Sequence, residues 1–181
     1  SAGEPMWRGG LSAPKSLFLH AERPLISENA TSTLLHEIMH MALGLDSEDG
    51  YDWIVEGLAE HYSLQLLSRS GGISATRYTA ARQDLAEWAR DATSLCGTHS
   101  TGSRTALAVG VLARLDGEIA EATAGEASLD DLVRDLLSRG ELLDLNVLTA
   151  SATAIIGHKP DALHSDRLPG CRSITPTPET Q

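Results

Sequence analysis

Residues 34–43 read Leu34-Leu35-His36-Glu37-Ile38-Met39-His40-Met41-Ala42-Leu43, and this stretch sets our expectation of the fold. Its apolar residues predict a buried helix in which His36 and His40 share one face, about a turn apart. Two imidazoles so placed can bind one metal ion, and Glu37 can reach a metal-bound water without being a ligand. The alternative is a chance pattern of two hydrogen-bonded histidines on a buried helix. Burying these polar groups costs free energy unless they bind something, which favours a metal site.

A second block of chemically useful residues reads Trp53-Ile54-Val55-Glu56-Gly57-Leu58-Ala59-Glu60-His61-Tyr62. A catalytic zinc site needs a third protein ligand. Glu56 and Glu60 share a helical face, so one can bind the metal while the other orients a ligand histidine. His61 points about 100° away from that face and is the weaker candidate. The alternative is two solvated carboxylates, but the apolar neighbours of Glu56 leave little solvent-facing surface.

The composition predicts a mainly α protein of about one domain. The chain has 181 residues, of which 41% are apolar but only 4% aromatic, so the core must consist mostly of leucine, alanine, isoleucine and valine. Alanine and leucine are strong helix formers. The formal net charge of −11 argues against a nucleic-acid surface or an anionic membrane surface. The apolar runs are all shorter than the roughly 18 residues of a membrane-spanning helix.

The capping and breaking residues predict a helical array with a small β element at its N-terminal edge. We expect a catalytic domain over 1–158, with a short β edge within 9–22 that includes a strand at 16–20, and helices from about residue 29. An irregular tail follows at 159–181. The expected helices start after Ser27 or Asn29 and end near Gly44, and then cover 53–70, 75–93, 103–124, 129–139 and 144–156.

Cys96 and Cys171 are the two cysteines of the chain, and both lie in loop-like contexts. One disulfide between them would tie the tail to the body and would indicate an oxidising compartment, periplasmic or extracellular. Two free thiols are the alternative, and in that case the compartment stays unknown.

The two blocks together resemble the gluzincin metallopeptidases, and more closely their aminopeptidase-N-like and glycyl-aminopeptidase-like branches. The resemblance rests on His36-Glu37-x-x-His40 followed by Trp53-x-x-Glu56-Gly57-x-Ala59, and it extends diffusely over about residues 9–140. It implies a thermolysin-like catalytic lobe in which His36, His40 and Glu56 bind Zn²⁺ and Glu37 is the catalytic base. Glu60 and Tyr62 are then expected behind the ligands, in the second layer of the site.

Two positions depart from the pattern of that family. Leu107 stands where the family usually has a tyrosine that stabilises the oxyanion, and Gly9-Gly10-Leu11 is not followed by the carboxylate that binds a free amine in aminopeptidases. Loss of one oxyanion donor can cost ~2.7–4 kcal/mol. The candidate substitutes are Tyr51, Tyr62, Tyr78, His61 and His99.

We therefore expect a zinc-dependent metallopeptidase that acts on peptide or protein substrates, with a further substrate-binding domain outside this chain. The alternative is a catalytically impaired zinc-binding relative that serves as a protein-binding or scaffold domain. Arg104 could hold a substrate carboxylate, although a plain surface charge is the simpler interpretation, and Trp88 is expected on the buried face of its helix. The remaining histidines have no ligand spacing and are expected to be solvated or locally bonded: His20, His99, His158 and His164.

Overall fold

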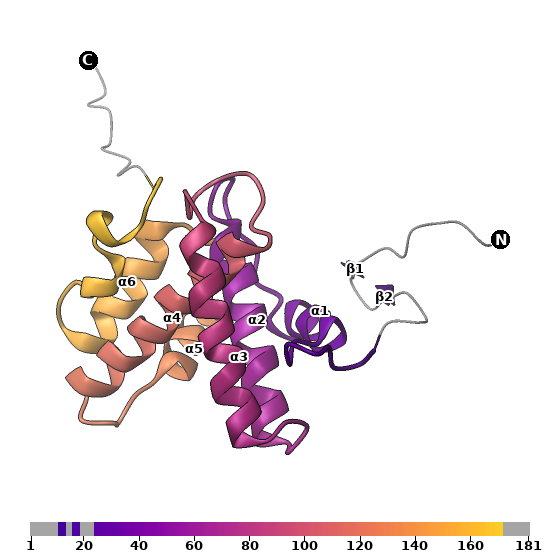
Figure 1. The fold of residues 1–181 in the computed structure, drawn as a ribbon. Helices are drawn as coiled ribbons and strands as arrows, with labels where there is room; N and C mark the ends of the chain where they lie inside the picture. Colours follow the sequence, from indigo (N-terminus) through magenta and orange to yellow (C-terminus); the bar gives the residue numbers. More distant parts are fainter. Residues whose placement is uncertain (1–10, 14–15, 19–23, 172–181) are drawn as a thin grey trace, which may run out of the picture.

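The computed structural model describes residues 11–13, 16–18 and 24–171, and within them the chain is mainly helical (Figure 1). A two-stranded antiparallel hairpin, with Leu11 paired to Phe18, precedes the helices. The elements in chain order are β1 (Leu11–Ala13), β2 (Ser16–Phe18), α1 (Thr33–Leu43), α2 (Asp52–Arg69), α3 (Ala75–Trp88), α4 (Ser103–Ala122), α5 (Leu129–Arg139) and α6 (Leu145–Ile156). The mainly α prediction is confirmed.

Most helix ends follow the capping residues that the sequence offers. Ser74, Ser128 and Asp144 each accept a hydrogen bond from a backbone N–H of the first turn that follows, and Ser128 with Asp131 forms a complete capping box. Gly44 ends α1 in the left-handed conformation at φ +58°, which glycine adopts without strain. Local side-chain chemistry therefore fixes where these helices begin and end.

Three predicted helix ends were wrong. The cap of α1 is Ser32, because Ser27 instead closes a turn on Thr31. Asp52 does not cap α2 but is its first residue, and its carboxylate accepts a hydrogen bond from the Ser100 N–H. The third helix ends at Trp88 and is followed by a short 3₁₀ helix at Ala89–Asp91.

The core is centred on α2 and α4, which pack closely at Gly57. An added Cβ at Gly57 would lie 2.8 Å from the Cβ of Ala108 and 2.9 Å from Cδ1 of Leu112, so only glycine fits here. The buried Trp53 and Ile54 of α2 join the largest apolar cluster, together with residues of α4, α5 and α6. This packing sets how closely α2 approaches α4 next to Glu56, which precedes Gly57.

Helix α1 lies at the edge of the helical body, between α2 and the β hairpin (Figure 1). Glu37 is its one buried residue, whereas Ile38 and Met41 are exposed.

The predicted position of Trp88 on the buried face of α3 is wrong. Its side chain is 47% exposed, and its ring lies beside Gly102 rather than in the core.

The segment after α6 contains two short 3₁₀ helices, at Asp161–Leu163 and Ser165–Arg167. It is attached to the body by a disulfide between Cys96 and Cys171. Among the described residues, no helix combines the length and the apolar character needed to cross a bilayer.

Candidate metal centre

His36, His40 and Glu56 meet where α1 packs against α2. Each offers one ligand atom, and these atoms lie within 4.8 Å of one another. The Nε2 atoms of the two histidines are 3.0 Å apart. The Glu56 carboxylate spans both rings, with Oε2 at 3.1 Å from His36 Nε2 and Oε1 at 3.2 Å from His40 Nε2. Two imidazole nitrogens and a carboxylate oxygen converging in this way are a ligand set typical of zinc.

Glu60 lies behind this cluster, one helical turn after Glu56. Its Oε2 atom is 3.0 Å from Nδ1 of His36. A hydrogen bond from Nδ1–H to a carboxylate fixes the tautomer of a histidine and leaves its Nε2 lone pair free for a metal ion. The two glutamates therefore contact different nitrogens of His36: Glu56 lies at Nε2 and Glu60 at Nδ1.

The charges of the cluster stabilise one another. Burial lowers the pKa of His36, but hydrogen bonds and charge interactions with Glu56 and Glu60 outweigh it, so the net shift is strongly upward. Burial raises the pKa of Glu56, and its contacts with His36 and His40 reverse that shift to a net lowering. The two carboxylates thus favour the protonated form of His36.

Glu37 follows His36 on α1 and is 8% exposed. A carboxylate is seldom buried to this degree, because burial removes its hydration. Its burial and its place directly after His36 make Glu37 the candidate general base of the site.

Tyr62, which we expected behind the ligands, is not brought to the cluster. Its hydroxyl donates a hydrogen bond of 2.8 Å to Asp130 of α5, and its pKa is raised by burial and by that carboxylate. His61 is 5% exposed, and its ring lies edge-on to Tyr62. Burial lowers the pKa of His61 to about 4, so it is a neutral, structural histidine.

The other suggested oxyanion donors have different surroundings. Burial and the nearby Asp144 raise the pKa of Tyr51. The Tyr78 hydroxyl accepts a hydrogen bond of 3.4 Å from Arg82 of the same helix. The contacts of these tyrosines are thus with groups outside the cluster, and Leu107 packs against the main core.

Arg104 has a structural role. Its Nε donates to the Ser94 carbonyl at 3.1 Å, and its guanidinium also donates to the His99 carbonyl. Arg104 therefore holds a loop and is more than the plain surface charge of the simpler interpretation.

The described histidines other than His36, His40 and His61 are not part of the candidate metal group. His99, His158 and His164 are exposed, and His164 lies 3.9 Å from Asp161 on the same turn. His20 and Gly9-Gly10 fall outside the described residues.

Sequence reasoning missed Ser63, which continues the face of α2 that Glu56 and Glu60 begin. Ser63 is 1% exposed, and its hydroxyl donates a long hydrogen bond of 3.4 Å to the Ser32 carbonyl at the start of α1. The signal was present in the sequence, because residues 56, 60 and 63 follow the spacing of one helical face.

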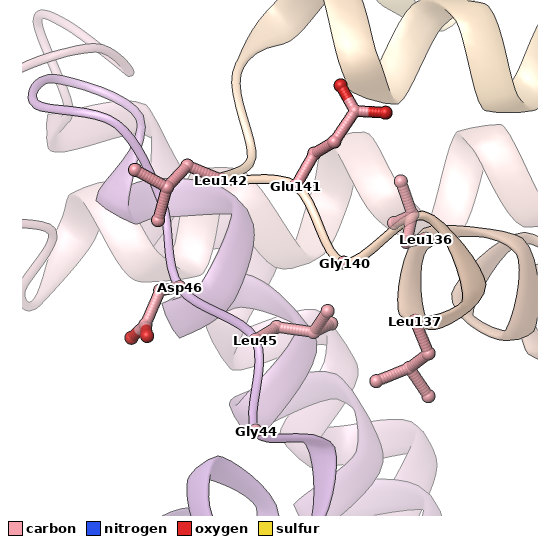
Figure 2. A pocket seen from close by; sticks show the side chains of 8 residues that line it. All are labelled: Gly44, Leu45, Asp46, Leu136, Leu137, Gly140, Glu141 and Leu142. Atoms are coloured by element: carbon pink, nitrogen blue, oxygen red, sulfur yellow. The ribbon is translucent and has the colours of Figure 1, made fainter.

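A separate hollow of about 160 Å³, with leucine and acidic side chains in its lining, lies between the end of α1 and the end of α5 (Figure 2). Its lining comprises Gly44, Leu45, Asp46, Leu136, Leu137, Gly140, Glu141 and Leu142. The hollow is not lined by His36, His40 or Glu56, so it is not part of the candidate centre.

Comparison with protein-family models, with curated proteins and with solved structures finds no match to this chain.

Proposed function

We propose that this protein is a zinc-dependent metallopeptidase of the gluzincin type, in which His36, His40 and Glu56 hold the metal ion. The observation that carries the proposal is the convergence of their ligand atoms within 4.8 Å of one another. This donor set suits zinc and leaves one of its four tetrahedral positions for water or substrate. On this proposal, the helices form a thermolysin-like catalytic lobe, and a substrate-binding domain lies outside this chain.

Each polar residue then has a defined task in hydrolysing a peptide bond. When bound, zinc lowers the pKa of its water and polarises the substrate carbonyl. Glu37 accepts the proton of the attacking water and later donates it to the leaving amine. Glu60 accepts the hydrogen bond from His36 Nδ1–H, which keeps the Nε2 lone pair directed at the metal position.

The test is the variant Glu37→Gln, which keeps the size of the side chain but removes its basicity. We expect it to retain zinc and to lose the cleavage of a mixed peptide library, with activity reduced by about 10²–10⁴-fold. Glu48→Gln, at an exposed loop position, is the matched control and should cleave like the wild type. Cleavage by Glu37→Gln at the wild-type rate would contradict the assignment of the base.

A second candidate function is zinc binding without efficient catalysis, as in a scaffold or protein-binding domain. Leu107 offers no hydrogen bond to an oxyanion, and Tyr62 and Tyr78 are engaged with Asp130 and Arg82. A peptide-library screen of the zinc-loaded protein separates the two functions. Cleavage that a zinc chelator abolishes supports the peptidase, whereas binding of a partner protein without any cleavage supports the scaffold.

The disulfide between Cys96 and Cys171 bears on the compartment. Because disulfides persist mainly in oxidising environments, we propose that the protein works in the periplasm or outside the cell. Cell fractionation with trapping of free thiols tests this location, and recovery of the native protein from the cytoplasm would contradict it.

A further inference from the structure

Residues 160–171, which we call the C-terminal strap, have no part in the proposed chemistry. The strap nevertheless packs into the main core, where it shares an apolar cluster with the first turn of α2. Its backbone is also bound to α4, since the Ala162 N–H donates a hydrogen bond of 2.8 Å to Glu118. Three apolar residues of the strap are at most 2% exposed: Ala162, Leu163 and Leu168.

Residues 94–100, which we call the bridging loop, are fastened to the strap. The disulfide joins Cys96 to Cys171 across a sequence separation of 75 residues. Beside it, the Leu95 N–H donates a hydrogen bond of 2.7 Å to the Pro169 carbonyl. The strap and the bridging loop are therefore joined by a covalent bond and by a backbone hydrogen bond.

The bridging loop is fastened equally directly to the start of α2. The Gly97 N–H donates to the Gly50 carbonyl at 3.1 Å, and the Ser100 N–H donates to the Asp52 carboxylate at 2.7 Å. Asp52 is the first residue of α2, and Glu56 follows one turn later on the same helix. A continuous set of covalent and hydrogen bonds thus runs from the disulfide to the turn that carries the third ligand.

We propose that the Cys96–Cys171 disulfide positions Glu56, so that opening it weakens metal binding while the helical body stays folded. This inference rests on the proposed metal site. A dithiol reductant would break the S–S bond by supplying two electrons and two protons, leaving two thiols and closing its own disulfide. The bridging loop would then keep its hydrogen bonds to Pro169 and from Arg104 but lose its covalent link to the strap, so it would hold the start of α2 less firmly. Metal retention in this protein is therefore coupled to the oxidation state of the two cysteines.

The experiment measures the zinc affinity of the full chain by competition with a chromophoric chelator. We compare the oxidised protein, the protein reduced by a dithiol that is removed before zinc is added, the reoxidised protein and the variant Cys96→Ser/Cys171→Ser. The expected loss on reduction is about tenfold or more, as for changes behind the ligands of other metal sites, and it should be reversed by reoxidation. Circular dichroism at the assay temperature reports whether the chain remains folded.

A second variant reaches the same linkage without touching the disulfide. Asp52→Ala removes the acceptor for the Ser100 N–H and should also weaken zinc binding, whereas Asp49→Ala, an equal charge change at an exposed loop position, should not. Leu85→Ala lowers the melting temperature through a separate apolar cluster, so it controls for general destabilisation. Retained affinity in this control, with losses in the reduced protein and in Asp52→Ala, supports the coupling.

Two results overturn the proposal in distinguishable ways. Unchanged affinity in the reduced protein overturns the coupling, whatever the result for Asp52→Ala, but leaves the metal site intact. Failure of the oxidised wild-type protein to bind zinc at all overturns the proposed function, and the coupling with it.

Discussion

Replacing Gly57 by alanine tests how α2 is held against α4 beside the metal site. The added Cβ would lie 2.8 Å from the Ala108 Cβ and 3.3 Å from the Ala108 carbonyl carbon, so part of the clash is with backbone that cannot move aside easily. Overpacking of this kind typically costs about 1–3 kcal/mol. Alanine in place of glycine in a helix contributes about 0.5–1 kcal/mol in the opposite direction. We expect Gly57→Ala to be destabilised by up to about 2 kcal/mol.

Gly117→Ala on α4 is the matched control. It makes the same change within a helix, but an added Cβ there meets no atom within 4 Å. This variant should gain about 0.5–1 kcal/mol, so the two variants should differ by about 1–3 kcal/mol in the free energy of unfolding measured in urea. Adding Ala108→Gly to Gly57→Ala should recover part of the loss, because it removes the nearest clashing atom. Equal stability of Gly57→Ala and Gly117→Ala would refute this description of the packing.

Three further predictions address other parts of the site and its surroundings. Glu60→Ala should lower zinc affinity by about 10–100-fold in a chelator competition, since His36 loses its Nδ1–H acceptor, and wild-type affinity would contradict its positioning role. Tyr62→Phe should lower the free energy of unfolding by about 1 kcal/mol, because the hydrogen bond to Asp130 is lost, and it should leave the zinc content unchanged. A fall in zinc content would show that Tyr62 belongs to the metal site. The pKa of His61 is lowered to about 4 by burial, so the unfolded chain binds a proton between about pH 6.5 and 4 while the folded chain does not. Stability should therefore fall by up to about 3 kcal/mol as the pH falls through that window, and His61→Gln should flatten the dependence measured by urea unfolding.

The sequence predicted the parts of this fold that depend on local chemistry. The capping box at Ser128, the cap at Asp144 and the stop at Gly44 all lie where the pattern placed them, because each acts on its own helix end. The shared face of Glu56 and Glu60 was likewise expected from the helical period alone. That period could indicate neighbouring side chains, but it could not show which of the two carboxylates lies nearer to both histidines.

The expectations that were wrong for Tyr62 and Arg104 depended on contacts outside their own helices. Tyr62 looked like a neighbour of the ligands, but it turns to Asp130 on α5, far along the chain. Arg104 was expected to be a surface charge, but in the structure its guanidinium donates hydrogen bonds to the Ser94 and His99 carbonyls. Helical periodicity gives the direction of a side chain on its own helix, but the partner on that side is set by tertiary packing.

The proposal that His36, His40 and Glu56 bind zinc is tested most directly by X-ray absorption at the zinc edge of the zinc-loaded protein. The account predicts one zinc ion per chain with about two imidazole nitrogens and one or two oxygens at about 2.0–2.2 Å, and with no sulfur ligand. The Glu56→Ala variant should show one oxygen neighbour replaced or the metal lost. A shell containing sulfur at about 2.3 Å, or one without imidazole scattering, would contradict the account.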